Sequence, residues 1–217
     1  MSFGQVTFEL FKGFQVSLLL FVLTLVFSLP LGLLMMLGLR SSHKLLRGLM
    51  AFLIWIIRGT PLMLQLLIVF FAPGLLFGSK FFGSHRFLAA TLTFVVNYAG
   101  YFAVIYKGGI ESIPKGQFEA GKVLGLSRWE VFKRIIFLQI IKQILSPISN
   151  EIITLVKDTS LVRVIAVIEI IKVAERFTAQ GLIWPLFYTA VFYLIFSGLL
   201  SILFQKAEEK LSYFEPA

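Results

Sequence analysis

The sequence predicts an all-α, polytopic membrane protein with five transmembrane helices. Of its 217 residues, 58% are hydrophobic and only 14% are charged, whereas soluble domains average about 25% charged residues. Several apolar stretches exceed about 18 residues, the length that is typical of a transmembrane helix. The net charge of +9 comes from basic residues beside these stretches, as the positive-inside rule expects. This distribution disfavours a nucleic-acid-binding protein.

The residue types that carry most enzyme chemistry are scarce. The chain has no cysteine and two histidines, His43 and His85, which lie in different predicted loops. Disulfides and thiolate ligands are therefore excluded, and we expect no metal site. We find no phosphate-binding loop and no nucleophile elbow in the sequence. We therefore expect one transmembrane domain over 1–217, with no enzymatic activity and no cofactor of its own.

The first two spans are expected at 13–39 and 49–77. The first is too long for the core of a signal peptide, which has about 7–15 residues, and it lacks a small-residue cleavage site, so we expect it to remain as a span. The motif Arg58-Gly59-Thr60-Pro61 interrupts the second span. Pro61 has no N–H to donate and displaces the carbonyl of Ile57, so we expect a broken helix here.

Three further spans are predicted, at 87–106, 135–157 and 182–204. A polar link at 78–86 precedes them, and a charged connection at 107–134 lies between the first two of them. Apolar and charged residues alternate over 157–181, which we interpret as an extension of the fourth helix followed by an interfacial segment.

Lysine and arginine counts favour a topology with the amino terminus outside and the carboxyl terminus in the cytoplasm. Eleven basic residues then lie on the cytoplasmic side: Arg40, Lys44, Arg47, Lys107, Lys115, Lys122, Arg128, Lys133, Arg134, Lys206 and Lys210. Seven lie on the other side: Lys12, Lys80, Arg86, Lys157, Arg163, Lys172 and Arg176.

The charged connection has the local signals of two short helices. Pro114 breaks the preceding helix, and 117–125 can form a helix that ends at Gly125, a residue that tolerates left-handed backbone. Ser127 with Glu130 three residues later predicts a capping box at the start of a second helix. These signals fit an amphipathic hairpin resting on lipid headgroups and a docking surface for a cytoplasmic protein equally well.

A resemblance separates these two readings. Glu119-Ala120-Gly121, followed by Gly125 and Ile135, resembles the EAA loop of ABC-importer permeases, with Gly121 at the third small position and Phe137-Leu138 in place of the usual Leu-Pro. Three further motifs, in the same order, resemble the permease subunits of polar amino acid ABC transporters: Arg58-Gly59-Thr60-Pro61, Ile113-Pro114-Lys115-Gly116-Gln117 and Lys157-Asp158-Thr159-Ser160-Leu161. The resemblance covers almost the whole chain.

The resemblance implies a type I importer in the bacterial inner membrane. Its expected partners are a second permease subunit (a second copy or a paralogue), two cytoplasmic ATPase subunits that bind ATP and Mg²⁺, and an extracytoplasmic amino acid-binding protein. The EAA segment would be a coupling helix that docks into the ATPase, with Glu119 pairing with a basic residue, the small residues allowing close approach and the apolar residues supplying contact. The residues expected to contact the ATPase are Phe118, Glu119, Ala120, Gly121, Val123, Leu124 and Gly125.

Polar residues inside the predicted spans are candidates for substrate binding, because they are costly in lipid. Glu151, Thr154 and Asp158 share one face of the fourth helix. The break at Thr60 can offer backbone N–H groups to a carboxylate. The full candidate set is Thr60, Thr93, Asn97, Glu151, Thr154 and Asp158. Two carboxylates on one wall favour cationic amino acids (arginine, lysine or histidine), with glutamine or glutamate as the other candidates.

Each candidate also has a structural interpretation. Asn97 can hydrogen-bond to a neighbouring helix, Glu151 can pair with Lys157 or with a partner subunit, and Asp158 can form an interfacial pair with Lys157. Arg58 is expected to extend to the inner surface, and the tyrosines are expected to be interfacial anchors. The alternative function is a non-ABC membrane channel or a scaffold subunit of an export apparatus.

Overall fold

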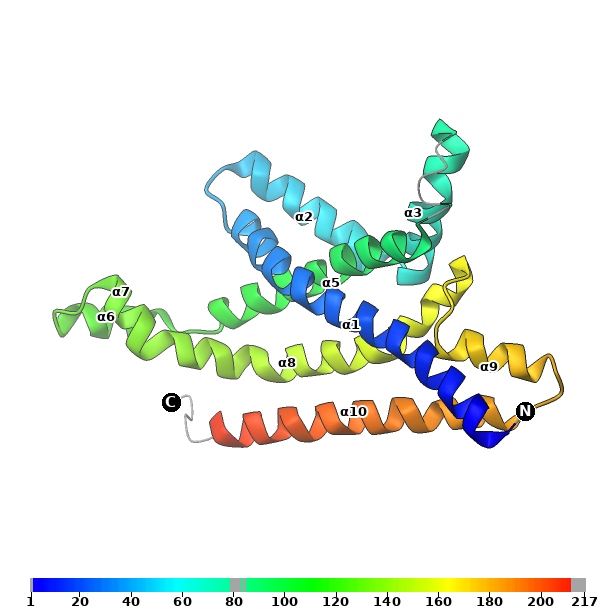
Figure 1. Ribbon diagram of the computed structural model, residues 1–217. Helices are drawn as coiled ribbons and strands as arrows, with labels where there is room; N and C mark the ends of the chain where they lie inside the picture. Colours follow the sequence, from blue (N-terminus) through cyan, green and yellow to red (C-terminus); the bar gives the residue numbers. More distant parts are fainter. Residues whose placement is uncertain (1, 79–82, 84, 212–217) are drawn as a thin grey trace.

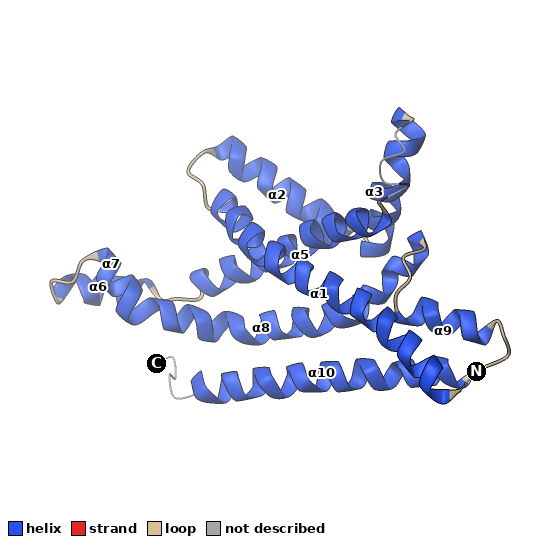
Figure 2. Cartoon of the chain, in the orientation of Figure 1, coloured by secondary structure: helices blue, strands red, loops and turns tan. Residues whose placement is uncertain are grey.

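The computed structural model describes residues 2–78, 83 and 85–211, and all regular structure within them is helical (Figure 2). In chain order the elements are α1 (Phe3–Leu39), α2 (Lys44–Gly59), α3 (Leu62–Phe77), α5 (Arg86–Glu111), α6 (Lys115–Val123), α7 (Arg128–Val131), the π-helix η1 (Phe132–Ile136), α8 (Phe137–Asp158), the 3₁₀-helix η2 (Thr159–Ile165), α9 (Ile170–Thr178) and α10 (Trp184–Leu211). Most of the predicted link at 78–86, with Lys80, and the end of the tail, 212–217, lie outside the described residues.

Five helical segments correspond to the predicted spans. Among the described residues, α1, α5 and α10 are long and apolar enough to cross a membrane by themselves, and α2 with α3 qualifies as one span that is bent by 105°. The fifth, α8, has 22 residues and is less apolar. It lies between α5 and α10 (Figure 1). The predicted all-α membrane fold is therefore confirmed.

The first helix begins ten residues before the predicted span, at Phe3 instead of residue 13. Its start has a capping box, in which the Ser2 side chain accepts from the backbone N–H of Gln5 and the Gln5 side chain accepts from the backbone N–H of Ser2. The added turns pack Val6 and Leu10 against α9, where both side chains are fully buried.

The centre of the bundle is α5, which is the most buried of the membrane-spanning helices. Leu20 of α1, Phe94 of α5 and Leu155 of α8 are fully buried in one hydrophobic cluster. Gly32 lets α1 approach α5 closely, because a Cβ there would lie 2.9 Å from the Cβ of Phe102. Small residues at helix crossings are typical of membrane bundles. In contrast, only 6% of the apolar window of α10 is buried.

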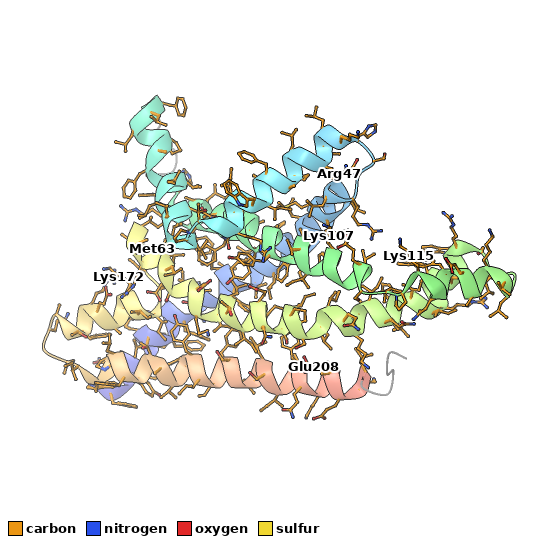
Figure 3. The ribbon with its side chains drawn as sticks, turned by 180° about the vertical axis from the view of Figure 1, so that it is seen from behind. Arg47, Met63, Lys107, Lys115, Lys172 and Glu208 are labelled. Carbon is orange, nitrogen blue, oxygen red and sulfur yellow. The ribbon has the colours of Figure 1, made fainter. Side chains whose placement is uncertain are left out.

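The two ends of the bundle differ. The α6–α7 hairpin, the α1–α2 connection and the end of α10 gather toward one end, whereas the start of α1, α9 and the end of α3 lie toward the other (Figure 1). Viewed from behind, Arg47, Lys115 and Glu208 lie toward the first end and Lys172 toward the opposite one (Figure 3). We call these the α6 end and the α9 end.

The segment after α8 extends that helix for seven residues, as predicted for part of 157–181, but as a 3₁₀-helix. The α-helix stops at Asp158 and continues as η2 to Ile165. Ala166 then takes a left-handed conformation (φ 57°), and α9 starts after Glu169, whose carboxylate accepts hydrogen bonds from two backbone N–H groups. The chain thereby turns back along the α9 end.

Candidate functional site

A pocket of about 600 Å³ lies where the break between α2 and α3 faces α5 and α8. Its wall from the break comprises Arg58 to Met63, and its other walls come from α5, α8 and η2: Asn97, Tyr98, Tyr101, Glu151, Thr154, Asp158 and Leu161. The break itself follows from Pro61, which ends the α2 hydrogen-bond ladder and starts α3 at Leu62.

Five of the six candidate substrate residues line this pocket, namely Thr60, Asn97, Glu151, Thr154 and Asp158. The structure places Thr93 apart from them. Its side chain is buried, its hydroxyl donates to the carbonyl of Ala89 at 2.8 Å, and it faces an apolar cavity bordered by Leu64 and Leu92. Thr93 and Asn97 are four residues apart on α5, but Thr93 lines the apolar cavity and Asn97 lines the pocket.

The two carboxylates of the pocket differ in their hydrogen bonding. The hydroxyl of Tyr98 donates to Asp158 Oδ2 at 2.8 Å. Glu151 receives no hydrogen bond from the residues that the structure describes, and neither carboxylate forms an ion pair with Lys157 there. The Glu151 carboxylate, which is half-buried, is thus available to a cation in the pocket.

Three polar or charged residues of the pocket, Arg58, Tyr98 and Tyr101, were not predicted to line it. Arg58 does not extend away to the inner surface, because α2 ends beside the pocket, and its guanidinium lies 5.4 Å from the centre of the Tyr101 ring. Tyr98 is 2% exposed, so it is a core residue and not an interfacial anchor. Tyr98 and Tyr101 are three residues apart, a spacing that could have predicted that both side chains lie on the same face of α5.

The pocket therefore combines one guanidinium with two carboxylates, together with the hydroxyls of Thr60 and Thr154. A guanidinium binds a carboxylate in a planar, bidentate arrangement. A free carboxylate suits an ammonium or guanidinium group. This combination can bind a small molecule that carries both charges.

The second candidate site is the α6–α7 hairpin at the α6 end. Its two helices occupy the predicted positions, Gly125 between them has φ 76°, and Ser127 forms the predicted capping box with Glu130. The backbone N–H and the hydroxyl of Ser127 both donate to Glu130, at 3.0 and 2.8 Å, and these bonds lower the pKa of that carboxyl. The predicted turn chemistry is confirmed.

Most of the expected ATPase-contacting residues are exposed on this hairpin. Val123 and Leu124 are 88% and 75% exposed, and Phe118, Glu119, Ala120 and Gly125 are exposed as well. Gly121 is buried instead, because its Cα faces Val131 of α7, where a Cβ would lie 2.3 Å from Cγ2. Its small size therefore serves the packing of α6 on α7 and not an outward contact.

Two features join the hairpin to α8. The side-chain amides of Gln117 and Gln139 exchange hydrogen bonds of 2.9 and 2.8 Å. Between α7 and α8 the chain forms the π-helix η1, in which the N–H of Phe137 donates to the carbonyl of Phe132. Wide turns of this kind are rare and are frequently found at functional sites.

Comparison with known families identifies the chain. The model of the family described as "binding-protein-dependent transport system inner membrane component" matches residues 28–211, which include both candidate sites. The chain belongs to this family. The resemblance that the EAA-like motif suggested is confirmed, and a non-ABC channel or export scaffold is excluded.

Curated members of the transport family match along nearly their whole length. The glutamine transport system permease protein GlnP of Escherichia coli K12 is 34% identical over 206 residues, which cover 93% of this chain and 92% of that protein. The L-cystine transport system permease protein TcyB of Bacillus subtilis 168 is 33% identical over 202 residues, which cover 92% and 85%.

Solved structures show the same fold. A crystal structure described as an amino acid ABC transporter with histidines superposes with a TM-score of 0.83 at 28% identity, covering 95% of each chain. The MetNI methionine ABC transporter in an inward-facing conformation has a TM-score of 0.70 at 15% identity over 97% and 99% of the two chains, which shows the fold alone. As a permease subunit of a binding-protein-dependent system, this chain is not itself an enzyme, and the ATPase is a separate subunit.

Proposed function

We propose that this chain is the permease subunit of an amino acid importer and that the pocket beside the α2–α3 break contacts the transported amino acid. The observation that carries the proposal is the convergence of Arg58, Glu151 and Asp158 on one pocket within the membrane-spanning bundle. Charged groups inside membrane spans are costly and usually functional. Relatives named for glutamine and cystine transport, and a structure described as containing histidines, support an amino acid as the substrate.

The charges of the pocket favour a cationic amino acid. Arg58 can pair with the α-carboxylate, and one of the two acids can pair with the α-ammonium group. The second acid is then left for a cationic side chain, as in arginine, lysine or histidine. Glutamine, for which the Escherichia coli relative is named, would leave that acid without a partner.

Uptake into proteoliposomes tests this specificity. The complex with its ATPase and binding protein is reconstituted, and uptake of labelled arginine, histidine and glutamine is compared for the wild type and Glu151→Gln. We expect arginine uptake to fall about tenfold or more, because a buried charge pair loses one partner, while glutamine uptake changes little. Equal losses for both amino acids, or no loss for either, would contradict the cationic preference.

The α6–α7 hairpin is proposed to couple this pocket to ATP hydrolysis. Phe118, Val123 and Leu124 present apolar surface for a groove on the ATPase, and Glu119 beside them can pair with a basic residue there. ATP and Mg²⁺ would bind in that partner. Closure of an ATPase dimer would then draw the hairpins of two permease subunits together and open the pocket toward the binding protein.

The proposed topology follows from the same arrangement. The α6 end carries the hairpin that would meet a cytoplasmic ATPase, so the carboxyl terminus lies in the cytoplasm and the amino terminus outside. The eleven basic residues counted for the cytoplasm lie on the hairpin and η1, at the end of α5, on the α1–α2 connection and the start of α2, and at the end of α10. These segments gather toward that end (Figure 1). The second permease subunit, as a copy or a paralogue, completes the expected assembly in the inner membrane.

A further inference from the structure

We infer that Gln65 is a positioning residue that holds the broken α2–α3 span in the bent form required by the pocket. The inference rests on the proposed role of that pocket in transport. Gln65 lies on the first turn of α3, and its side chain is half-buried. It borders the apolar cavity behind the break, which Thr60 also lines, whereas Arg58 lines only the pocket on the other side. Gln65 therefore acts on the break from outside the pocket.

The break leaves a carbonyl that must be satisfied. In an unbroken helix the N–H of residue 61 would donate to the carbonyl of Ile57, but Pro61 has no N–H. An unpaired carbonyl is expensive inside a membrane bundle, where water does not replace the lost donor. Gln65 Nε2 supplies that donor at 2.7 Å from the oxygen of Ile57.

The same amide group also fixes the residue at the corner. Gln65 Nε2 lies 2.9 Å from Thr60 Oγ1 and 3.1 Å from the carbonyl oxygen of Thr60. The hydroxyl of Thr60 in turn donates to the carbonyl of Ile56 at 2.8 Å. One side chain of α3 thus bonds to the last turn of α2 and to the corner residue, across a bend of 105°.

A third helix holds this side chain in place. The Nδ2 group of Asn97 donates to Gln65 Oε1 at 3.1 Å, and Asn97 is 4% exposed on α5, the most buried of the spans. Acceptance of this bond orients the Gln65 amide with its nitrogen toward the break. Asn97 therefore connects the corner of the broken span to the helix that also carries Tyr98, which bonds to Asp158 on the opposite wall.

The consequence is that the distance between the Arg58 side and the carboxylate side of the pocket depends on Gln65. Without the N–H groups of the Gln65 side chain, the backbone at Ile57 and Thr60 can change its conformation. The guanidinium of Arg58 then loses its fixed position relative to Glu151. The effect falls on substrate affinity more than on turnover, because Gln65 contacts the pocket residues Thr60 and Asn97 and not the hairpin.

Transport kinetics test the affinity effect. Gln65→Met keeps the length of the side chain and removes its donors, and Gln15→Met makes the same change at an exposed glutamine of α1. With arginine, histidine and glutamine as probes, we expect Gln65→Met to raise the half-saturating concentration about tenfold with the maximal rate within about twofold, and Gln15→Met to match the wild type. An unchanged half-saturating concentration with a reduced maximal rate would overturn the inference.

A distance measurement tests the bend without any substrate. Since the chain has no cysteine, spin labels can be attached at Trp55→Cys on α2 and Leu75→Cys on α3, both exposed positions. In the full complex we expect one narrow distance distribution for the wild type and a broadened one for Gln65→Met. Asn97→Leu should broaden the distribution less. If Gln65→Met does not assemble, Asn97→Leu alone provides the test. A wild-type distribution in both variants would overturn the role of Gln65. If instead the wild-type complex transports none of the three amino acids while the distributions still broaden, the proposed substrate class fails and the bend assignment stands.

Discussion

At the scale of single residues, the packing of Gly121 explains a departure from the family motif. An alanine is usual at the third position of the EAA pattern, and here it would place its Cβ 2.3 Å from Val131 Cγ2. Val131 is 1% exposed, so it cannot move toward solvent to make room. The glycine and the valine are therefore matched to each other across the α6–α7 hairpin.

This match gives a stability prediction. Gly121→Ala should destabilise the packing of α6 on α7 by about 1–3 kcal/mol, as overpacking does, and should reduce the amount of ATPase that co-purifies with the permease. Gly116→Ala, in the same helix with no atom within 4 Å of the added Cβ, is the control. The double variant Gly121→Ala/Val131→Ala should restore co-purification, and failure to restore it would contradict the steric explanation.

Glu175 of α9 gives a prediction about pH. Its carboxylate bonds to Lys172 at 2.9 Å and to Arg163 of η2 at 2.5 Å, and these bonds, above all the one from Lys172, lower its pKa. A lowered pKa adds stability above the ordinary carboxyl pKa of about 4.3 and loses it as the pH falls through the folded-state value. The groups are partly exposed, so the contribution is below about 1 kcal/mol.

The measurement is thermal unfolding of the detergent-solubilised complex for the wild type and Glu175→Gln. The wild type should be slightly more stable at pH 7, and the difference should shrink below pH about 4 and disappear once the pH is below the lowered pKa. A difference that stays constant from pH 7 to pH 3 would show that the ion pairs at the α9 end are not its source.

At the scale of elements, the connection between the α6–α7 hairpin and α8 is where the proposed coupling would pass from the ATPase toward the pocket. The family's Leu-Pro is absent, and η1 with the Gln117–Gln139 pair stands at this joint. Gln139 also donates to the carbonyl of Ile135, so one side chain contacts both the π-helix and α6. Since α8 carries Glu151 and Asp158, this joint lies on the covalent path from the hairpin to the pocket.

Gln139→Leu should therefore weaken coupling and leave assembly intact. We expect the number of amino acids transported per ATP hydrolysed to fall about fivefold, equivalent to the ~1 kcal/mol that a hydrogen bond contributes. Gln143→Leu, one turn later on α8 and exposed, is the control. If Gln139→Leu lost the ATPase altogether, the pair would be a folding contact and not a transmission contact.

At the scale of the whole molecule, the absence of cysteine makes the proposed topology directly measurable. Gly4→Cys lies at the start of α1 and Gly116→Cys at the start of α6, both exposed and with no atom within 4 Å of an added Cβ. In right-side-out vesicles a membrane-impermeant maleimide should label Gly4→Cys at once and Gly116→Cys only after the membrane is opened. Immediate labelling of Gly116→Cys would reverse the topology.

The sequence was most informative where a local rule determines the structure. Apolar length predicted the spans, because backbone groups in lipid must bond within their own helix. Pro61 predicted the break, and Ser127 with Glu130 predicted the capping box. The capping box of Ser2 and Gln5 has comparable local spacing, and it would have placed the start of the first helix correctly.

Features that depend on distant contacts were not predictable in this way. The bond from Gln65 to Ile57 spans eight residues across a bend whose angle no local pattern fixes. Arg58 lines the pocket because α2 stops beside it, and Thr93, one turn before Asn97 on the same face of α5, lines the apolar cavity instead. Whether the five pocket residues bind substrate stays a prediction.

The wide turn η1 sets the angle, around the axis of α8, between the α6–α7 hairpin and the pocket residues of α8. An α-helix advances about 100° per residue around its axis, and η1 holds one more residue in its hydrogen-bonded ring than an α-turn does. Deleting one residue between Phe132 and Ile136 would turn the α6–α7 hairpin about 100° around the axis of α8 and point Val123 and Leu124 away from their present direction. The single extra residue of the π-turn therefore fixes the direction in which the hairpin points relative to α8.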